Sequence, residues 1–319
     1  MPKVKFTPEQ YAEAAAKFRG PLLAVPYLSL SAILQYMTPR LGVTGEEIVG
    51  ESTVKAQLHP YRPDEIQKAD VDIKLRILKT YFGTCNLNFI PNNVITTIIG
   101  HKASQAKGDG LKSTISAQMV LTNVAKYIGE DLGYAIWKGV RNPAGKTTMD
   151  LFDGFDEITR KEIESGNLSE ENGNYLKVPA ITKANAVDVF KQILYALHPV
   201  LRRTECFMYV APELADLYNE CFQMSHSGLI YNDKYEQVVV EGSSKKLIIV
   251  PMAEKAGSNY IQVCPKTNML VGMDQMSDKE SVNVGKYSSD TLTFEMRAFY
   301  GAQFESIDKR RMLVAEVGE

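Results

Sequence analysis

The sequence predicts an α+β fold, and three observations support this class. Several short segments alternate apolar and polar residues with the period of two that is typical of strands. One segment, 113–139, carries a long helical pattern. Strands and helices do not alternate regularly, which argues against a doubly wound parallel sheet. The length of 319 residues suggests about two domains or one large domain.

The composition is that of an ordinary globular protein. Hydrophobic residues make up 45% and charged residues 23% of the chain, which excludes a mainly disordered protein. No apolar run approaches the roughly 18 residues of a membrane span, and the N-terminus lacks the apolar core of a secretory signal. We therefore expect no membrane contact and free intracellular thiols. The cysteines are Cys85, Cys206, Cys221 and Cys264.

Charge is unevenly distributed along the chain. The net charge of −2 argues against a strongly basic nucleic-acid-binding protein. Segment 1–45 is mainly basic, however, and segment 150–171 is mainly acidic. Opposite charges of this kind attract, so the two segments could join neighbouring copies. The alternative, which we prefer, is that both segments are simply solvated.

The first 45 residues are expected to form an arm outside the core. Residues 8–19 favour a short helix, which Gly20 and Pro21 would end. The further prolines Pro26 and Pro39 forbid a long element in the rest of the segment.

Two strand patterns follow, joined by a polar tip rich in proline and charge. Segment 52–59 alternates apolar and polar residues, and segment 70–77 does so more cleanly. A two-stranded ribbon is marginally stable in water by itself. Its apolar face must therefore rest either on its own domain or on another subunit. That face would carry Val54, Leu58, Val71, Ile73, Leu75 and Ile77.

The pattern over 113–139 predicts a helix about 40 Å long, because each residue adds 1.5 Å. Gly129 and Gly133 each weaken such a helix by about 1 kcal/mol relative to alanine. Their spacing of four residues indicates either the close approach of another backbone or a locally loosened helix end. Both alternatives stay open.

The second half of the chain alternates between helical and strand patterns and ends rich in strands. A helix is expected over 185–197 and another from Pro212 onward, with a buried strand between them at 206–210. The later strand patterns lie at 237–240, 246–250 and 260–264, and at 292–300 with 281–285 as its hairpin partner.

A phosphate-binding loop is suggested by AGKTT at 144–148 but fails two tests. The motif needs a glycine five residues before the glycine of GKT, and that position holds Val140; Gly139 is one residue too early. The motif also needs a strand before it, whereas a long helix precedes it here.

No other catalytic or metal-binding pattern is present. The histidines His59, His101, His198 and His226 form neither an HExxH pair nor a CxxC…H pattern. No GxSxG sequence occurs. We therefore expect no enzyme, no cofactor and no metal.

The order of these elements resembles that of the major capsid proteins of tailed bacteriophages, which have the Hong Kong 97-type fold. Helix 113–137 followed by WKGVRNPAGKT resembles the spine helix of that family and its following loop. Segments 184–220, 247–274 and 285–304 resemble its later helix–strand–helix unit and its closing strands. Each motif is weak, but their shared order covers roughly residues 50–305.

The resemblance implies a division of the chain and a set of subunit contacts. The parts would be an N-terminal arm (1–50), an extended hairpin loop (51–82), a peripheral domain (83–149 and 265–319, with spine helix 113–139) and an axial domain (150–264). The subunit contacts would be Val54, Leu58, Lys68, Val71, Ile73, Leu75, Ile77, Gly129 and Gly133.

The resemblance also implies a structural function: a subunit that forms hexamers and pentamers of an icosahedral phage or prophage shell around DNA. Expected partners are further copies, a separate scaffolding protein, a portal, and DNA bound without sequence specificity. The location would be the virion capsid, and the host cytoplasm before assembly. Some relatives cross-link a loop lysine to a neighbour's asparagine; Lys68 with Asn268 or Asn283 would be the positions, but the sequence does not support this pairing.

Two alternatives remain at this point. One is a nanocompartment shell of the encapsulin type, which has the same fold but encloses an enzyme. The other, from a different class, is a nucleotide- or ligand-binding enzyme that uses the loop 139–150.

Overall fold

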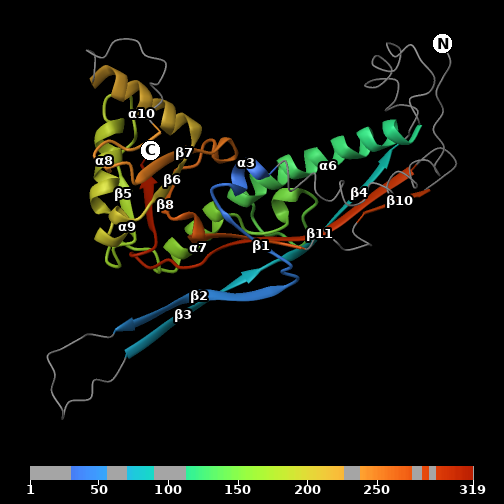
Figure 1. Ribbon diagram of the computed structural model, residues 1–319, viewed down its shortest axis with the longest axis horizontal. Helices are drawn as coiled ribbons and strands as arrows, with labels where there is room; N and C mark the ends of the chain where they lie inside the picture. Colours follow the sequence, from blue (N-terminus) through green and yellow to red (C-terminus); the bar gives the residue numbers. More distant parts are fainter. Residues whose placement is uncertain are drawn as a thin grey trace.

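Three β-sheets and a set of helices make up the computed structural model, which describes residues 30–55, 70–89, 113–225, 238–274, 282–286 and 292–318. The first sheet has five strands in the order β1-β9-β11-β10, with β4 also paired to β11, and the second has five in the order β5-β12-β8-β6-β7. The third is the pair of β2 (Glu46–Lys55) and β3 (Asp70–Lys79). In Figure 1 the second sheet and its helices lie at one end, and the ribbon β2-β3 extends away from both larger sheets. The α+β class is confirmed.

The first sheet is built around one long strand, β11. This strand is antiparallel to β4, β9 and β10, and β1 is parallel to β9. The predicted hairpin of 281–285 with 292–300 is confirmed by the pair β10–β11. The strands are β1 (Thr38–Leu41), β4 (Tyr81–Phe89), β9 (Met269–Met273), β10 (Val282–Lys286) and β11 (Leu292–Phe304).

The second sheet contains the predicted buried strands β6, β7 and β8. The segment predicted as a strand at 237–240 forms a single bridge, between Val239 and Ile248, in its described part. The last strand, β12, pairs with β5 and β8 and so belongs to this sheet. The range 265–319, which the prediction places in the peripheral domain, thus contributes strands to both sheets, and its last strand pairs with β5 and β8 from the range predicted as the axial domain. The strands are β5 (Tyr175–Val178), β6 (Cys206–Val210), β7 (Leu247–Pro251), β8 (Tyr260–Cys264) and β12 (Leu313–Val317).

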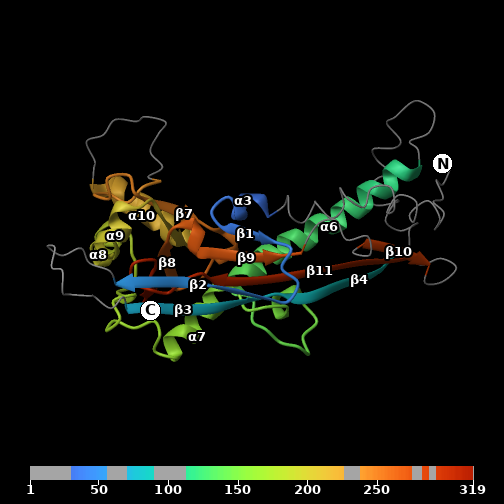
Figure 2. The same ribbon diagram turned by 60° about the horizontal axis from the view of Figure 1, so that its bottom comes forward.

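Helices flank both sheets. The predicted long helix is α6 (Ser113–Lys138), which runs alongside β4 and β11 in both views (Figures 1 and 2). The other two predicted helices are α8 and α10. The remaining elements are α3 (Ser31–Leu34), α7 (Phe155–Glu164), α8 (Ala186–Ala196), α9 (Pro199–Arg203), α10 (Pro212–Ser225) and the 3₁₀ turns η2 (Thr148–Asp150), η3 (Ala253–Lys255) and η4 (Lys266–Asn268).

One hydrophobic core joins the two larger sheets. Trp137, at the end of α6, lies 5.6 Å from Phe155 of α7 and 5.6 Å from Tyr209 of the second sheet, measured between ring centroids. Phe155 in turn lies 5.0 Å from Phe304 of β11 in the first sheet. These rings bury large apolar areas and prefer tilted contacts of this kind. A second core lies between the second sheet and the helices α8 and α10, where Phe190 and Tyr218 meet.

Residues 30–41 belong to the core, so the prediction of an arm is wrong for this part of the first 45 residues. Leu30, Ile33, Leu34 and Met37 are buried in the first core. Their spacing of i, i+3, i+4 and i+7 is that of a helix face. The proline at 39 concealed this signal, but proline is tolerated in an edge strand such as β1. The segment 1–29, with its predicted helix 8–19, lies outside the described residues.

The close approach at the glycines of α6 is made within the subunit. Helix α6 continues through Gly129 and Gly133, so a loosened helix end is excluded. A Cβ added at Gly133 would lie 2.9 Å from Cδ1 of Ile33 and 3.6 Å from Cδ2 of Leu30, both beside α3 of the same chain. Gly133 is therefore withdrawn as a subunit contact. Gly129 is also buried, and its contact with a neighbour stays a prediction.

We expect Gly133→Leu to lower the free energy of unfolding by about 1–3 kcal/mol, because the side chain would overpack the contact with α3. Gly133→Ala is the matched control. Its Cβ would come closer than 3.0 Å only to the flexible end of Ile33, with Glu254 Cγ at 3.4 Å in ordinary contact. Alanine also favours a helix by about 1 kcal/mol relative to glycine, so little net change is expected. Urea denaturation of the two variants measures the difference. A leucine variant as stable as the wild type would contradict this packing.

Candidate subunit interface

The predicted ribbon is present as β2 (Glu46–Lys55) and β3 (Asp70–Lys79), paired antiparallel. Its first strand begins at 46, six residues earlier than the pattern at 52–59 indicated. The tip, 56–69, lies outside the described residues, and so do the predicted contacts Leu58 and Lys68. The register places Val54 opposite Val71, Ser52 opposite Ile73 and Gly50 opposite Leu75.

One face of the ribbon base is fixed to the rest of the subunit. Val49 and Leu78 are buried together with Leu270 of β9. The next residue after β3, Thr80, is also buried and bonds to the turn before β2: its hydroxyl donates to the carbonyl of Val43 at 2.9 Å and accepts from the backbone N–H of Gly45 at 2.8 Å. The base is therefore held by both apolar packing and hydrogen bonds.

A partly buried arginine strengthens this attachment. Arg76 of β3 donates to Oε1 of Glu162, on α7, at 2.5 Å and to Oε1 of Gln303, on β11, at 3.0 Å. The Arg76 and Glu162 side chains are only 14% and 16% exposed. An ion pair shielded from water to this extent is stronger than an exposed one. Arg76 thus fixes the direction of the ribbon relative to α7 and the first sheet.

The opposite face of the ribbon is apolar and exposed. Ile48, Leu75 and Ile77 are 69%, 64% and 42% exposed. Ile48 lies directly opposite Ile77, and alternate residues of a strand share a face, so these three side chains form one surface. Among the described residues, nothing of the same chain covers it. We call this surface the ribbon face.

Gly50 allows the backbones of the two ribbon strands to approach closely. A Cβ at Gly50 would lie 2.4 Å from the carbonyl oxygen of Lys74, so a side chain does not fit there. Leu75 therefore has no side chain directly across from it. This arrangement leaves Leu75 free to contact something outside the subunit.

The loop after α6 has no place for a phosphate. The carboxylate of Asp150 accepts from the backbone N–H of Lys146 at 3.2 Å and from that of Thr147 at 3.0 Å. The Thr147 hydroxyl also donates to it at 2.5 Å and, with these bonds, holds the pKa of Asp150 below its usual value. A carboxylate already occupies the donors that a phosphate would need, and it would repel the anion. This excludes the AGKTT segment as a phosphate-binding loop.

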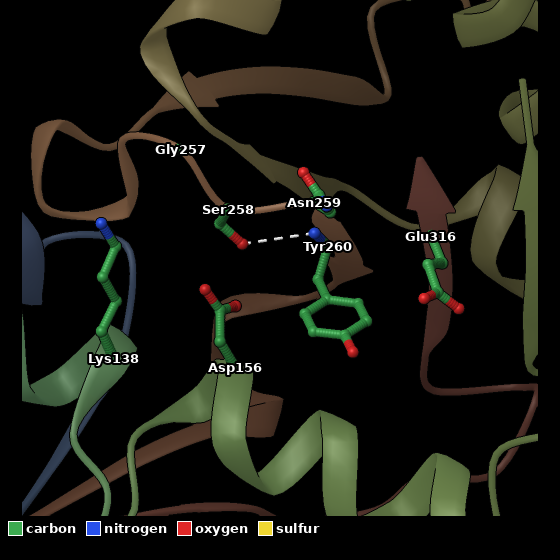
Figure 3. Close-up of a pocket in the computed structure, with 7 residues that line it drawn as sticks. All are labelled: Lys138, Asp156, Gly257, Ser258, Asn259, Tyr260 and Glu316. Carbon is green, nitrogen blue, oxygen red and sulfur yellow. Dashed lines mark hydrogen bonds between the residues drawn. The ribbon is translucent and has the colours of Figure 1, made fainter. Parts of the chain in front are cut away.

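The pocket in Figure 3 is lined by groups that already bond within the protein. Asp156 accepts from Lys255 at 2.5 Å and from Gln262 at 2.9 Å. Lys138 donates to the carbonyl of Ala256, and Glu316 accepts from the hydroxyl of Tyr175. Its charged side chains therefore stabilise the junction between α6, α7, η3 and the second sheet, and the pocket does not present a free acid–base pair.

Lys255 is the most unusual residue of this junction because it is a fully buried lysine. Besides Asp156, its ammonium lies 4.8 Å from the centre of the Trp137 ring. Burial lowers the pKa of Lys255, and the neighbouring carboxylate of Asp156 opposes that shift. The ion pair thus connects η3 with the first turn of α7 beside the shared core.

The remaining chemical expectations concern metals, thiols and membranes. In the described ranges, no group of three or more His, Cys, Asp or Glu residues could hold a metal ion. Cys85, Cys206, Cys221 and Cys264 are free. No helix in the described part of the chain is long and apolar enough to span a membrane.

Asn268 is buried, and its side chain bonds to both backbone groups of Ser306, so it is not available for a cross-link.

The fold is shared with solved structures of phage particles. A chain of the satellite phage P4 procapsid, a structure that includes the size determination protein Sid, is 10% identical and superimposes with a TM-score of 0.56 over 92% of this chain and 98% of its own length. A chain of Gordonia phage Cozz is 9% identical, with a TM-score of 0.51 over 91% of this chain and 87% of its own. No family model and no curated protein matches the sequence. The chain therefore has the Hong Kong 97-type capsid fold.

We expect Lys255→Met to lower the free energy of unfolding by about 3–5 kcal/mol, because it leaves the carboxylate of Asp156 without its cation. The double variant Lys255→Met/Asp156→Asn removes both charges and keeps an acceptor for Gln262. We expect it to recover much of that loss. Urea denaturation of the two single variants and the double variant gives the coupling energy. Additive losses would contradict a direct ion pair.

Proposed function

We propose that this protein is the major capsid subunit of a tailed phage or prophage and that copies of it form the hexamers and pentamers of an icosahedral shell around DNA. The fold supports this, since it spans almost the full length of the matched chain from the P4 procapsid. The observation that carries the proposal is the ribbon face, an exposed apolar surface on an element whose other face is fixed to its own subunit. Such a surface gains stability only when another molecule covers it.

The proposed parts follow the sequence analysis with three changes. The extended loop begins at 46, where β2 begins, and residues 30–41 join the core. Residues 313–317 go with the second sheet, in the axial part. The peripheral part then consists of α6 with the first sheet, and the axial part of the second sheet with α8, α9 and α10.

In the proposed shell, Leu75 and Ile77 contact a neighbouring subunit, together with Val54, Val71 and Ile73 on the same ribbon and with Leu58 and Lys68 at its tip. Every subunit then both gives a ribbon and receives one. A contact between two different surfaces of this kind is heterologous, and it builds closed rings when the rotation between copies closes. A separate scaffolding protein, a portal and non-specifically bound DNA complete the set of proposed partners.

The two alternatives lack a specific observation in their favour. The two solved structures described above, with TM-scores of 0.56 and 0.51, come from phages, which supports a DNA shell over an enzyme-filled compartment. A ligand-binding enzyme that uses 139–150 would need donors that Asp150 already occupies.

The ribbon face is tested by Leu75→Asp, which places a charge on the surface that a neighbour would bury. We expect a folded subunit with an unchanged denaturation midpoint and a loss of particles, because an unpaired charge in an apolar contact costs several kcal/mol. The measurement is electron microscopy and sedimentation of the protein, expressed alone and together with the proteins encoded beside it.

The matched control is Lys74→Asp, which introduces the same residue one position earlier, on the other face of β3. We expect this variant to form particles. Global unfolding of the Leu75 variant would instead mean that the ribbon belongs to the core of its own subunit. Equal particle yields for the two variants would refute docking through the ribbon face.

A further inference from the structure

Within the described part of the chain, the edge of the first sheet at β4 has no further strand beside it. From Tyr81, opposite Tyr300, to Phe89, opposite Leu292, β4 pairs with β11 on one side. Among the described residues, no backbone hydrogen bond joins the other side of β4 to a further strand. Figure 2 shows β4 beside β11 at this border of the sheet. A strand edge of this kind presents backbone donors and acceptors that can pair with another strand.

The opposite edge of the same sheet is formed by β1 and β10, and β1 carries features that prevent pairing. Strand β1 has only four residues and contains Pro39 and Arg40. Proline and charge are the usual means by which proteins block edge-to-edge association. Strand β4 has nine residues, and its sequence YFGTCNLNF contains neither a proline nor a charge. The edge at β1 is therefore protected, whereas the edge at β4 is suited to pairing.

Apolar side chains accompany the open edge. Phe82 is 53% exposed, with its ring centre 5.0 Å from that of Phe299 on the neighbouring strand. Leu87, near the other end of β4, is 42% exposed. A second strand laid against this edge would bury part of both side chains and would also satisfy the free backbone groups.

We infer that β4 pairs antiparallel with β4 of a second copy, across a two-fold axis. This inference rests on the proposed function, because an icosahedral shell contains two-fold axes and each of them brings one surface against itself. An antiparallel pair of identical strands has this symmetry. The partner is therefore a second copy of this chain, and the two first sheets join into one continuous sheet.

We place the two-fold axis at Cys85, so that Cys85 lies opposite Cys85 of the partner subunit. Gly83 then lies opposite Leu87 of the partner subunit. Leu151 fills the space beside Gly83, with its Cδ2 and Cδ1 at 3.0 Å and 3.2 Å from the position of an added Cβ, and it offers Leu87 of the partner subunit an apolar neighbour. Thr84 lies opposite Asn86 of the partner subunit, and these two polar side chains can bond to each other.

Charge pairing across the axis tests the register. Thr84 and Asn86 are exposed, so lysine at either position leaves the subunit folded. Thr84→Lys/Asn86→Lys sets like charges opposite each other at both ends of the pair, whereas Thr84→Glu/Asn86→Lys sets opposite charges there. The second variant also places its glutamate opposite Arg297 and its lysine opposite Glu295 on β11, so it adds no like-charge pair within the subunit. We expect the first variant to give at least about tenfold fewer particles than the second, since each cross-strand charge pair changes sign between them.

A native thiol supplies the second readout. Directly opposite residues of an antiparallel pair have Cα atoms about 4.5–5.5 Å apart, within the range of a disulfide. Cys85 is half-buried, whereas Cys206, Cys221 and Cys264 are buried. Burial raises the pKa of Cys85, so oxidation with copper–phenanthroline is carried out at mildly alkaline pH. We expect assembled wild type to yield disulfide-linked dimers and the Cys85→Ser variant to yield none.

The outcomes separate this inference from the proposed function. Wild-type particles without a Cys85 cross-link, together with equal assembly of the two charge variants, would overturn β4 pairing and leave the capsid proposal standing. A wild-type protein that forms no particles under any of these conditions would overturn both. A cross-link in the wild type that is lost in the like-charge variant and kept in the opposite-charge variant supports the pairing.

Discussion

A two-stranded ribbon has two faces, and only one of them can be buried against the subunit that carries it. In this protein Val49 and Leu78 pack against the first sheet, and Arg76 binds Glu162 of α7, so one face of the ribbon is fixed to its own subunit. Ile48, Leu75 and Ile77 are left on the other face with no cover among the described residues. Since apolar surface in water is unfavourable, the subunit is most stable when a further molecule completes it. The proposed shell follows from this constraint more directly than from any single motif.

The platform that carries the ribbon is rigid because the two larger sheets share a core. Trp137 and Phe155 contact residues of both sheets, and the buried pair of Lys255 and Asp156 fixes η3 to α7 at the same place. Burying these two charges is costly unless they stay paired, so Lys255 and Asp156 remain in contact. The direction of α6, which ends in this junction, is therefore well defined relative to the second sheet.

Elements with a clear pattern in their own sequence could be predicted. The helices at 113–139 and 185–197 and the ribbon are indicated by periodicity, and the strands at 206–210 and 260–264 by short apolar runs. The short strands β1, β5, β9 and β12 are not predicted, because they are defined by pairing with distant strands. The nine-residue strand β4 is not predicted either, although Cys85, Leu87 and Phe89 alternate with polar residues in its second half. Leu30, Ile33, Leu34 and Met37 had a readable helical spacing, but the surrounding prolines concealed it.

The candidate subunit contacts differ in the same way. That Leu75 and Ile77 share one face of the ribbon could be predicted, since alternation along one strand reveals which side chains lie on the same side. The spacing of Gly129 and Gly133 left open either the close approach of another backbone or a loosened helix end. At Gly133 the structure shows neither, because side chains of Ile33, Glu254 and Leu30 from the same chain pack there. The carboxylate of Asp150 inside the AGKTT loop has no sequence signature, because its effect depends on the path of the backbone.

The attachment of Arg76 to α7 also has a mechanical consequence. Strand β3 continues for six residues beyond Arg76, to Asp70, so at about 3.3 Å per residue this part of the ribbon is a lever about 20 Å long. A tilt of about 10° at Arg76 displaces its far end by about 3.5 Å, which is close to the rise of one residue along a strand. In the proposed shell, small repacking around Glu162 and Gln303 would therefore shift the ribbon against a neighbouring subunit. The curvature of that shell would then depend on packing inside each subunit as well as on the contact between subunits.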